Sequence, residues 1–208
     1  MTPEWFEQVC QLALGHRTSQ EQTYDLARVT LARGIPGDFV ECGVFAGSSC
    51  AIMARAIMDH NAEVQAREQR GKSNARVHLF DCFEGIPKPG PHDDPAQVRE
   101  GEAACSLANV KANMRKWGIP DELIAYHPGL FSETVPHAAR ELTASHHQIA
   151  FLRLDGDLYE STRVCMEHLY PLVSKGGYVI CDDYDLHGCR YALHETVMPA
   201  PIAWRKWT

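Results

Sequence analysis

Four aspartates follow two apolar segments in the second half of the chain. Asp155 and Asp157 come after FLRL, and Asp182 and Asp183 come after YVIC, where Asp182 lies 27 residues after Asp155. If the segments are neighbouring strands, Asp155, Asp182 and Asp183 converge, and their repulsion calls for a cation. Carboxylate oxygens favour a hard ion such as magnesium over zinc. The pattern predicts a magnesium site, whereas helix capping by the same acids is the alternative.

A turn of the form E-x-G-x-x-x-G, from Glu41 to Gly47, follows another apolar segment. Its small residues, Gly43 and Gly47, let the backbone approach a ligand closely, and Ser48 or Ser49 is placed to cap a following helix. The turn departs from the dinucleotide pattern G-x-G-x-x-G, which disfavours a nicotinamide cofactor.

Two acids near this turn suggest what the ligand is. Glu41 suits a ligand that carries an ammonium group, and Asp81, at the end of the next apolar segment, is placed to accept hydrogen bonds from ribose hydroxyls. S-adenosylmethionine has both features. A glycine-containing turn that serves only tight packing is the alternative.

The elements that position these residues alternate along the chain after Asp38. Short apolar runs predict strands at 39–44, 76–81, 123–127, 149–155, 177–182 and 202–207. Helical spacing predicts helices at 48–70, 107–117, 135–144, 162–172 and 189–197. The alternation predicts an α/β fold with a doubly wound, mostly parallel sheet that binds ligands at the carboxyl ends of its strands.

Two further helices are expected before the first strand. One opens at Thr2-Pro3 and stops at Gly15, and the other opens with Ser19 and Gln22 as a capping box. They could pack on the core, cover the site or form a contact in a homo-oligomer. The chain is expected to be one domain over 1–208, with N-terminal helices at 1–36 and a catalytic core at 37–208.

The proline-rich stretch 85–95 cannot be a helix interior or a central strand. It is predicted to be a long loop, either a surface excursion or a flap beside the ligand. Among eleven histidines, His127 and His187 lie nearest the expected strand ends, as candidates for a second base or as polar lining.

The composition narrows the class of protein. The chain of 208 residues has 27 acidic and 20 basic side chains and a formal charge of −7, which disfavours nucleic acid as a partner. No apolar run approaches the roughly 20 residues of a membrane span. Glu4 and Glu7 interrupt any signal-like segment, so a cytoplasmic protein is expected, and its eight scattered cysteines are expected to be mostly reduced thiols.

Five segments together resemble a known family. GDFVECGVFAGSS, FDCFEGIP, PGLFSETVP, FLRLDGDLYEST and GGYVICDDY are similar, in this order, to segments of the macrocin O-methyltransferase family. The resemblance runs from about Arg17 to 204–206. It implies a Rossmann-like class I methyltransferase fold and S-adenosylmethionine- and magnesium-dependent methylation of sugar hydroxyls. Such proteins usually end in two strands, so the C-terminal hairpin is expected to be shortened here.

The resemblance also implies roles for individual residues. The magnesium ligands would be Asp155, Asp182 and Asp183, and the catalytic residues would be Asp155 and Asp157, with Asp157 as the general base. The cofactor would be bound by three groups of residues: Glu41, Gly43, Gly47 and Ser48; Asp81, Cys82 and Phe83; Gly129 and Phe131.

The implied acceptor is a small molecule or glycan with vicinal hydroxyls, of which magnesium would acidify and orient one. Binding the two reactants at adjoining strand ends would contribute mainly proximity and alignment. Three alternatives are a catechol-type O-methyltransferase, a haloacid-dehalogenase-like phosphatase suggested by D-G-D-L, and a non-enzymatic scaffold or ligand sensor. The phosphatase needs its D-x-D on the first strand, but here about 150 residues precede it.

Overall fold

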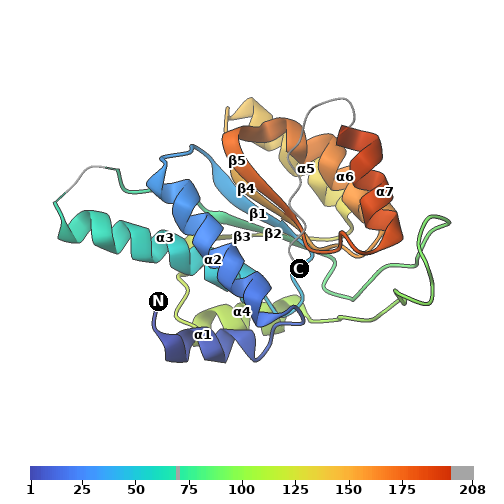
Figure 1. The fold of residues 1–208 in the computed structure, drawn as a ribbon, viewed down its shortest axis with the longest axis horizontal. Helices are drawn as coiled ribbons and strands as arrows, with labels where there is room; N and C mark the ends of the chain where they lie inside the picture. The colour runs from blue at the N-terminus through green and yellow to red at the C-terminus, as the bar shows by residue number, and fades with distance from the viewer. Residues whose placement is uncertain (69–70, 198–208) are drawn as a thin grey trace.

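The computed structural model describes residues 1–68 and 71–197 and contains a five-stranded parallel sheet. The strand order is β3-β2-β1-β4-β5, which confirms the predicted doubly wound α/β fold (Figure 1). The strands are β1 Asp38–Cys42, β2 Val77–Asp81, β3 Ile124–Pro128, β4 Ile149–Leu154 and β5 Val173–Cys181. The strand expected at 202–207 lies outside the described residues.

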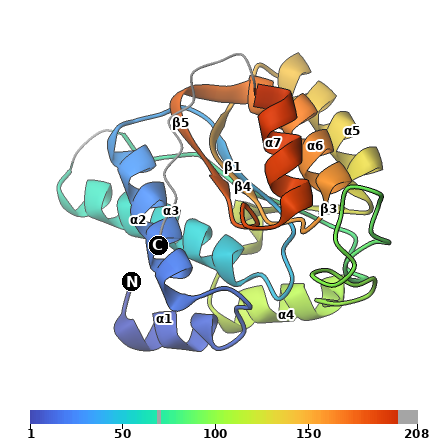
Figure 2. The ribbon, with the colours of Figure 1, turned by 45° about the vertical axis from the view of Figure 1, so that its right-hand side comes forward.

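Helices cover both faces of the sheet, as Figures 1 and 2 show. The first core cluster packs one face against α1 Pro3–Cys10, α2 Arg17–Ala32, α3 Ser48–Ala66 and α4 Leu107–Lys116. The second packs the other face against α5 Phe131–Ala144, α6 Tyr159–Leu169 and α7 His187–Val197. Short 3₁₀ turns occupy Asp121–Leu123 and Tyr170–Leu172. Within the described ranges, no helix is long and apolar enough to cross a membrane.

The central strands are buried on both faces, which explains their nearly continuous apolar sequence. Phe39 of β1 and Phe151 of β4 point toward α2 and α3, with ring centroids 5.6 Å apart. Val40 and Leu152, the next residues along the same strands, belong to the opposite cluster beneath α5 and α6. Alternation across a pleated strand therefore supplies both cores from one sheet.

Several helix boundaries differ from the prediction. The helix α2 begins at Arg17 with His16 as N-cap, so Ser19 does not form the expected capping box. The N-cap of α3 is Gly47, with φ of 88°, and neither Ser48 nor Ser49 takes that position. Both serines are helical residues at the start of α3, and their hydroxyls donate to Val9 and Glu41 in other elements.

Other helices also differ in length from the prediction. The first helix ends at Cys10 rather than near Gly15, and α3 ends at Ala66 rather than near residue 70. The helices α5 and α6 begin four and three residues before their predicted starts of 135 and 162, since they start at Phe131 and Tyr159. All eight cysteines are free thiols, consistent with the sequence expectation.

A histidine pair joins β2 and β3 on the face covered by α5. The Nδ1 atom of His78 lies 3.0 Å from Nε2 of His127, and its Nε2 lies 3.2 Å from Oδ2 of Asp38. His147 also reaches the Asp38 carboxylate, at 3.4 Å. The His127 ring stacks on Phe80, with centroids 4.1 Å apart. These contacts place His127 in sheet packing rather than in the role of a second base.

This pair makes the stability depend on pH. Burial, followed by the charges of His78, Arg76 and His137, lowers the pKa of His127 to about 4. The unfolded chain keeps a histidine pKa of about 6.5, so between about pH 6.5 and 4 it binds more protons than the folded chain. The free energy of unfolding therefore falls as the pH falls through this window.

We expect His127→Gln to reduce this loss of stability by the order of 1 kcal/mol, allowing for partial solvent screening. Urea unfolding at pH 7 and at pH 4.5 measures it. The exposed His168 of α6 is not among the groups that shift the pKa of His127, so His168→Gln serves as the control and should leave the difference between the two pH values nearly unchanged. An equal pH dependence in wild type and His127→Gln would contradict the assignment.

Candidate functional site

The carboxyl ends of β1 and β4 form the floor of a cavity. The strand order reverses between these two neighbours, and ligands bind at such a point in open α/β sheets. Gly43, with φ of 93°, lies so close to β4 that a Cβ atom there would be 1.6 Å from the carbonyl oxygen of Asp155. Only glycine allows this approach.

The cavity has a volume of about 480 Å³. Its lining comes from the turn after β1, the ends of β2, β4 and β5, the segment after β3, the 85–103 loop and the N-terminal segment Leu12–Gly15. Of the residues expected in the site, the lining includes Gly43, Ser48, Asp81, Cys82, Gly129, Phe131, Asp155, Asp157, Asp182 and Asp183. The remaining three, Glu41, Gly47 and Phe83, do not line it.

The four aspartates meet at this edge, as the sequence predicted. The amide of Asp155 donates to Cys42 at 2.8 Å, and that of Asp182 donates to Leu154 at 2.9 Å, so hydrogen bonds between neighbouring strands continue one residue beyond them. The amide of Asp157 donates to the Asp183 carboxylate at 2.9 Å.

The pKa values of two of these acids are raised, since the acids are buried and lie close to one another. Burial, together with the charges of Asp155 and Asp182, raises the pKa of Asp157 to about 7. Burial and the charges of Asp155 and Asp157 raise the pKa of Asp183 well above its usual range. Such repulsion among carboxylates favours binding of a positive charge.

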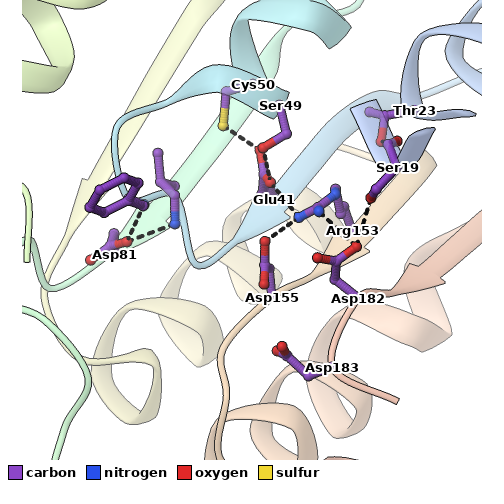
Figure 3. A network of polar contacts seen from close by, with 12 residues as sticks. Ser19, Thr23, Glu41, Ser49, Cys50, Asp81, Arg153, Asp155, Asp182 and Asp183 are labelled. Carbon is purple, nitrogen blue, oxygen red and sulfur yellow. Dashed lines mark hydrogen bonds and ion pairs between the residues drawn. The ribbon is translucent and has the colours of Figure 1, made fainter. Parts of the chain in front are cut away.

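A buried arginine supplies one such charge. Arg153 of β4 is the register partner of Glu41 of β1, and their side chains are 1% and 0% exposed. Its Nη1 atom donates to Oε1 of Glu41 at 2.9 Å and to the Asp155 carboxylate, while Nη2 lies 2.9 Å from Oδ1 of Asp182. Figure 3 shows the guanidinium between the three carboxylates.

The position of Glu41 corrects the expectation that its carboxylate meets a ligand ammonium group. Its Oε1 accepts from Arg153 and Ser49, and its Oε2 accepts from the Cys50 thiol at 2.6 Å. Burial raises the pKa of Glu41 to about 7, against the opposing effect of Arg153. Glu41 therefore joins the turn, α3 and β4 from below the cavity.

Asp81 lies at the cavity, on the end of β2. Its Oδ2 accepts from the amides of Val44 and Phe45 at 2.7 and 3.3 Å, and its Oδ1 accepts from the amide of Phe83 at 2.7 Å. Oδ2 is occupied by two amides, but Oδ1 has accepted only one hydrogen bond and keeps a second lone pair, so Asp81 holds the turn in place and can still accept from a ligand hydroxyl.

The two other residues absent from the lining have structural positions. A Cβ at Gly47 would lie 2.7 Å from Cε of Met114, so glycine here lets α4 pack against the start of α3. Phe83 is 8% exposed and belongs to the first core cluster. Gly47 and Phe83 are therefore placed for packing and not for direct contact with a cofactor.

Left-handed backbone occurs repeatedly at the cavity. Phe45, Ala103 and Asp157 line it and have φ values of 45°, 55° and 61°. Such conformations cost free energy and tend to gather at functional sites. Asp157 tolerates this backbone better than the other two, since aspartate occurs there more often.

The residue types at the cavity can be compared with the ligands that a divalent cation prefers. The carboxylates of Asp155, Asp182 and Asp183 offer the oxygen ligands that magnesium prefers. Within residues 1–68 and 71–197, no three His, Cys, Asp or Glu side chains are already arranged to hold a metal ion, and Asp155 and Asp182 are instead paired with Arg153. The residue types therefore fit magnesium, and binding would use oxygens that Arg153 leaves free.

Arg153 was not identified from the sequence, whereas a position over the site was one of the alternatives given for the two N-terminal helices, and Leu12–Gly15 and Gln20 do line the cavity. The segments FVEC of β1 and FLRL of β4 each carry one charged residue of opposite sign, but only the register between the two strands shows that these residues are opposite each other. Ser19 donates to Oδ1 of Asp182 at 2.8 Å, a long-range contact that no local sequence pattern indicates.

The loop that was expected at 85–95 contributes to the cavity with its first residues. Gly85, Ile86 and Pro87 line it, and Ile86 exchanges backbone hydrogen bonds with Gly101 and Glu102 at 2.8 Å. Farther along, Asp93 accepts from the amide of Tyr159 at the start of α6 at 2.7 Å. One part of the loop is thus beside the cavity and another part docks on α6.

Comparison with known proteins agrees with this architecture. The solved O-methyltransferase NovP is 31% identical, with a TM-score of 0.72 over 89% of this chain and 73% of that one. The calicheamicin methyltransferase CalS11 is 21% identical, with a TM-score of 0.71 over 98% of this chain and 89% of that one, and supports the fold. The fold is that of class I O-methyltransferases.

The family model for macrocin O-methyltransferases (TylF) matches residues 11–201, so the chain belongs to this family. A rhamnosyl-tetracenomycin C 4'-O-methyltransferase of Streptomyces olivaceus is 39% identical over 79% of this chain and 59% of its own length. Mycinamicin III 3''-O-methyltransferase of Micromonospora griseorubida is 36% identical over 79% of this chain and 62% of its own. The chain thus spans about three fifths of these relatives.

We expect Arg153→Met to lower the free energy of unfolding by about 3–5 kcal/mol, because it leaves a buried carboxylate without its partner. In the double variant with Glu41→Gln, the loss should be smaller than the sum of the two single losses. Urea unfolding at pH 7.5 measures all three.

Arg163→Met on α6 is the control. Within residues 1–68 and 71–197, Arg163 forms ion pairs only with Glu160 and Glu167 on the same helix, so its loss should cost about 1 kcal/mol or less. Additive losses for Glu41 and Arg153 would show that the two residues do not act as a pair.

Proposed function

We propose that the chain is an S-adenosylmethionine-dependent O-methyltransferase acting on a sugar or glycoside hydroxyl. One observation carries the proposal: a cavity at the switch point of the sheet has Asp81 on one side and four aspartates on the other. Asp81 suits the ribose of the methyl donor, and the aspartates suit the acceptor. Donor and acceptor would then meet above Gly43.

The nature of the acceptor is supported by the relatives. The Streptomyces olivaceus protein is named for 4'-O-methylation of a rhamnosyl-tetracenomycin, and the Micromonospora griseorubida protein for 3''-O-methylation of mycinamicin III. As a member of the same family, this chain is expected to use a related acceptor, one with vicinal hydroxyls. A catechol-type acceptor also offers vicinal oxygens and is the second candidate.

In the proposed reaction, the protein orients the acceptor hydroxyl toward the donor methyl group and removes its proton. Asp155, Asp182 and Asp183 would hold magnesium, and a bound divalent cation lowers the pKa of a hydroxyl that it contacts. Asp157 is assigned as the general base. Its carboxylate lines the cavity and makes no hydrogen bond or ion pair with the part of the chain described here, unlike Asp155 and Asp182.

The role of Arg153 in this scheme is electrostatic. It offsets part of the negative charge of the acid cluster from below, through ion pairs with Asp155 and Asp182, whose side chains are 32% and 25% exposed. The methyl group leaves a sulfonium and needs no acid, so catalysis rests on proton removal and on alignment of the two reactants.

The phosphatase alternative finds no support in the fold. That class requires these acids on the first strand, but Asp155 and Asp157 follow β4, which is the fourth strand along the chain.

The scaffold alternative is tested directly by assaying methyl transfer to rhamnose-containing glycosides and to catechols with S-adenosylmethionine and magnesium. Binding of the donor without transfer to any acceptor would favour a scaffold.

We expect Asp157→Asn to lower the rate of methyl transfer by roughly 10²–10⁴-fold while divalent-ion binding persists. Asparagine tolerates the left-handed backbone at this position, so the fold is retained. Asp183→Asn is the matched variant and should lose the ion. Calorimetry with Mg²⁺ or Mn²⁺ and a methyl-transfer assay separate the two, and full activity in EDTA would rule out the ion.

We expect Asp81→Ala to weaken binding of S-adenosylhomocysteine by roughly tenfold or more, because the ribose loses a charged acceptor. Asp81→Asn keeps one acceptor oxygen for the Val44 amide and should lose less. Calorimetry gives the affinities, and thermal unfolding verifies the fold of both variants. An affinity equal to that of the wild type would remove Asp81 from the donor site.

A further inference from the structure

A buried amide faces the cavity from the N-terminal region. Gln20, in the second turn of α2, lines the cavity although only 3% of the residue is exposed. Its Oε1 atom has no hydrogen-bond partner among the described residues. A buried amide oxygen without a partner costs about 1–3 kcal/mol, a cost that a ligand can remove.

The surroundings of Gln20 place it at the acid end of the cavity. A Cβ at Gly15 would lie 3.6 Å from Nε2 of Gln20 and 3.6 Å from Oδ2 of Asp182. The neighbouring Ser19 donates to the same carboxylate at 2.8 Å (Figure 3). Gln20 therefore stands beside the acids, whereas Asp81, the ribose acceptor of the proposed function, lies at the end of β2.

The methyl donor has a charged amino-acid portion on its sulfur, and this portion needs polar partners. Glu41 is not available, since its oxygens are taken by Arg153, Ser49 and Cys50. The hydroxyl of Ser48 donates to the carbonyl of Val9 at 3.0 Å. The side chains of the β1 turn and the start of α3 thus leave the ammonium and carboxylate groups to other partners.

The side-chain amide of Gln20 can bind both the ammonium and the carboxylate group of the methyl donor. Its oxygen accepts from an ammonium group and its NH₂ donates to a carboxylate. The amino end of α3, which lines the same cavity through Ser48 and Ser49, adds a favourable field for the carboxylate. Hydrogen bonds to charged groups are among the stronger ones in proteins.

We propose that Gln20 binds the amino-acid portion of S-adenosylmethionine, so that the segment from Leu12 to Gln20 forms the outer wall of the donor site. This inference rests on the proposed function and adds a specific partner to it. The N-terminal helices then serve binding as well as packing, through a residue that lies before the first strand.

The test compares two ligands that differ by this portion. S-adenosylhomocysteine carries it, and 5'-methylthioadenosine lacks it while keeping the adenosine and the thioether sulfur. Gln20→Leu should weaken S-adenosylhomocysteine by roughly tenfold or more and leave the affinity for 5'-methylthioadenosine within about twofold. Gln20→Met, with an unbranched chain, is the second variant in case leucine does not fit. Gln22→Leu on the same helix, outside the cavity lining, is the control.

Three other results would overturn the proposal. Equal weakening of both ligands would mean that Gln20 only supports the fold, and unchanged binding of both would remove it from the donor site. A variant that binds both ligands normally but needs a higher acceptor concentration would move Gln20 to the acceptor wall. If the wild type binds neither ligand, the proposed function itself fails and this inference with it.

Discussion

The buried contact between Arg153 and three carboxylates is the constraint on which the site depends. Its partners come from β1, the end of β4 and the end of β5, so one guanidinium joins three adjacent strands at their carboxyl ends. A planar group with several fixed donors suits this task, which lysine could not perform. Arg153 also offsets part of the repulsion among the acids that the ends of β4 and β5 bring together.

The same contact connects layers of the molecule. Glu41 binds Ser49 and Cys50 of α3, and Asp182 accepts from Ser19 of α2. Figure 3 shows these contacts as one continuous polar network below the cavity. The helices of one face are thus attached to the acid edge through side chains, in addition to their apolar packing.

Much of the fold could be predicted from the sequence, because buried parallel strands and amphipathic helices leave strong periodic signals. The four aspartates were also predictable, since parallel strands bring their carboxyl ends to one edge. The role of Glu41 was not, because its sequence position fits a ligand contact as well as an ion pair. Only the register between β1 and β4 shows that Arg153 lies opposite it.

Helix starts were harder to predict for a related reason. Ser19, Ser48 and Ser49 are good capping residues by type, yet each donates its hydroxyl to a distant element. Local propensity cannot reveal such partners, because tertiary contacts compete for the same hydroxyl group. Gln20 was missed because a single glutamine on a helix carries no pattern.

The contact of Gly43 with the backbone of Asp155 has an evolutionary consequence. The turn and the strand end approach each other through main-chain atoms, so their spacing does not depend on the side chain of Asp155. Under the proposed function, the span between methyl donor and acceptor is therefore set by the sheet itself. A change of acceptor would then be expected in the surrounding loops and the N-terminal wall, where insertions leave this spacing intact.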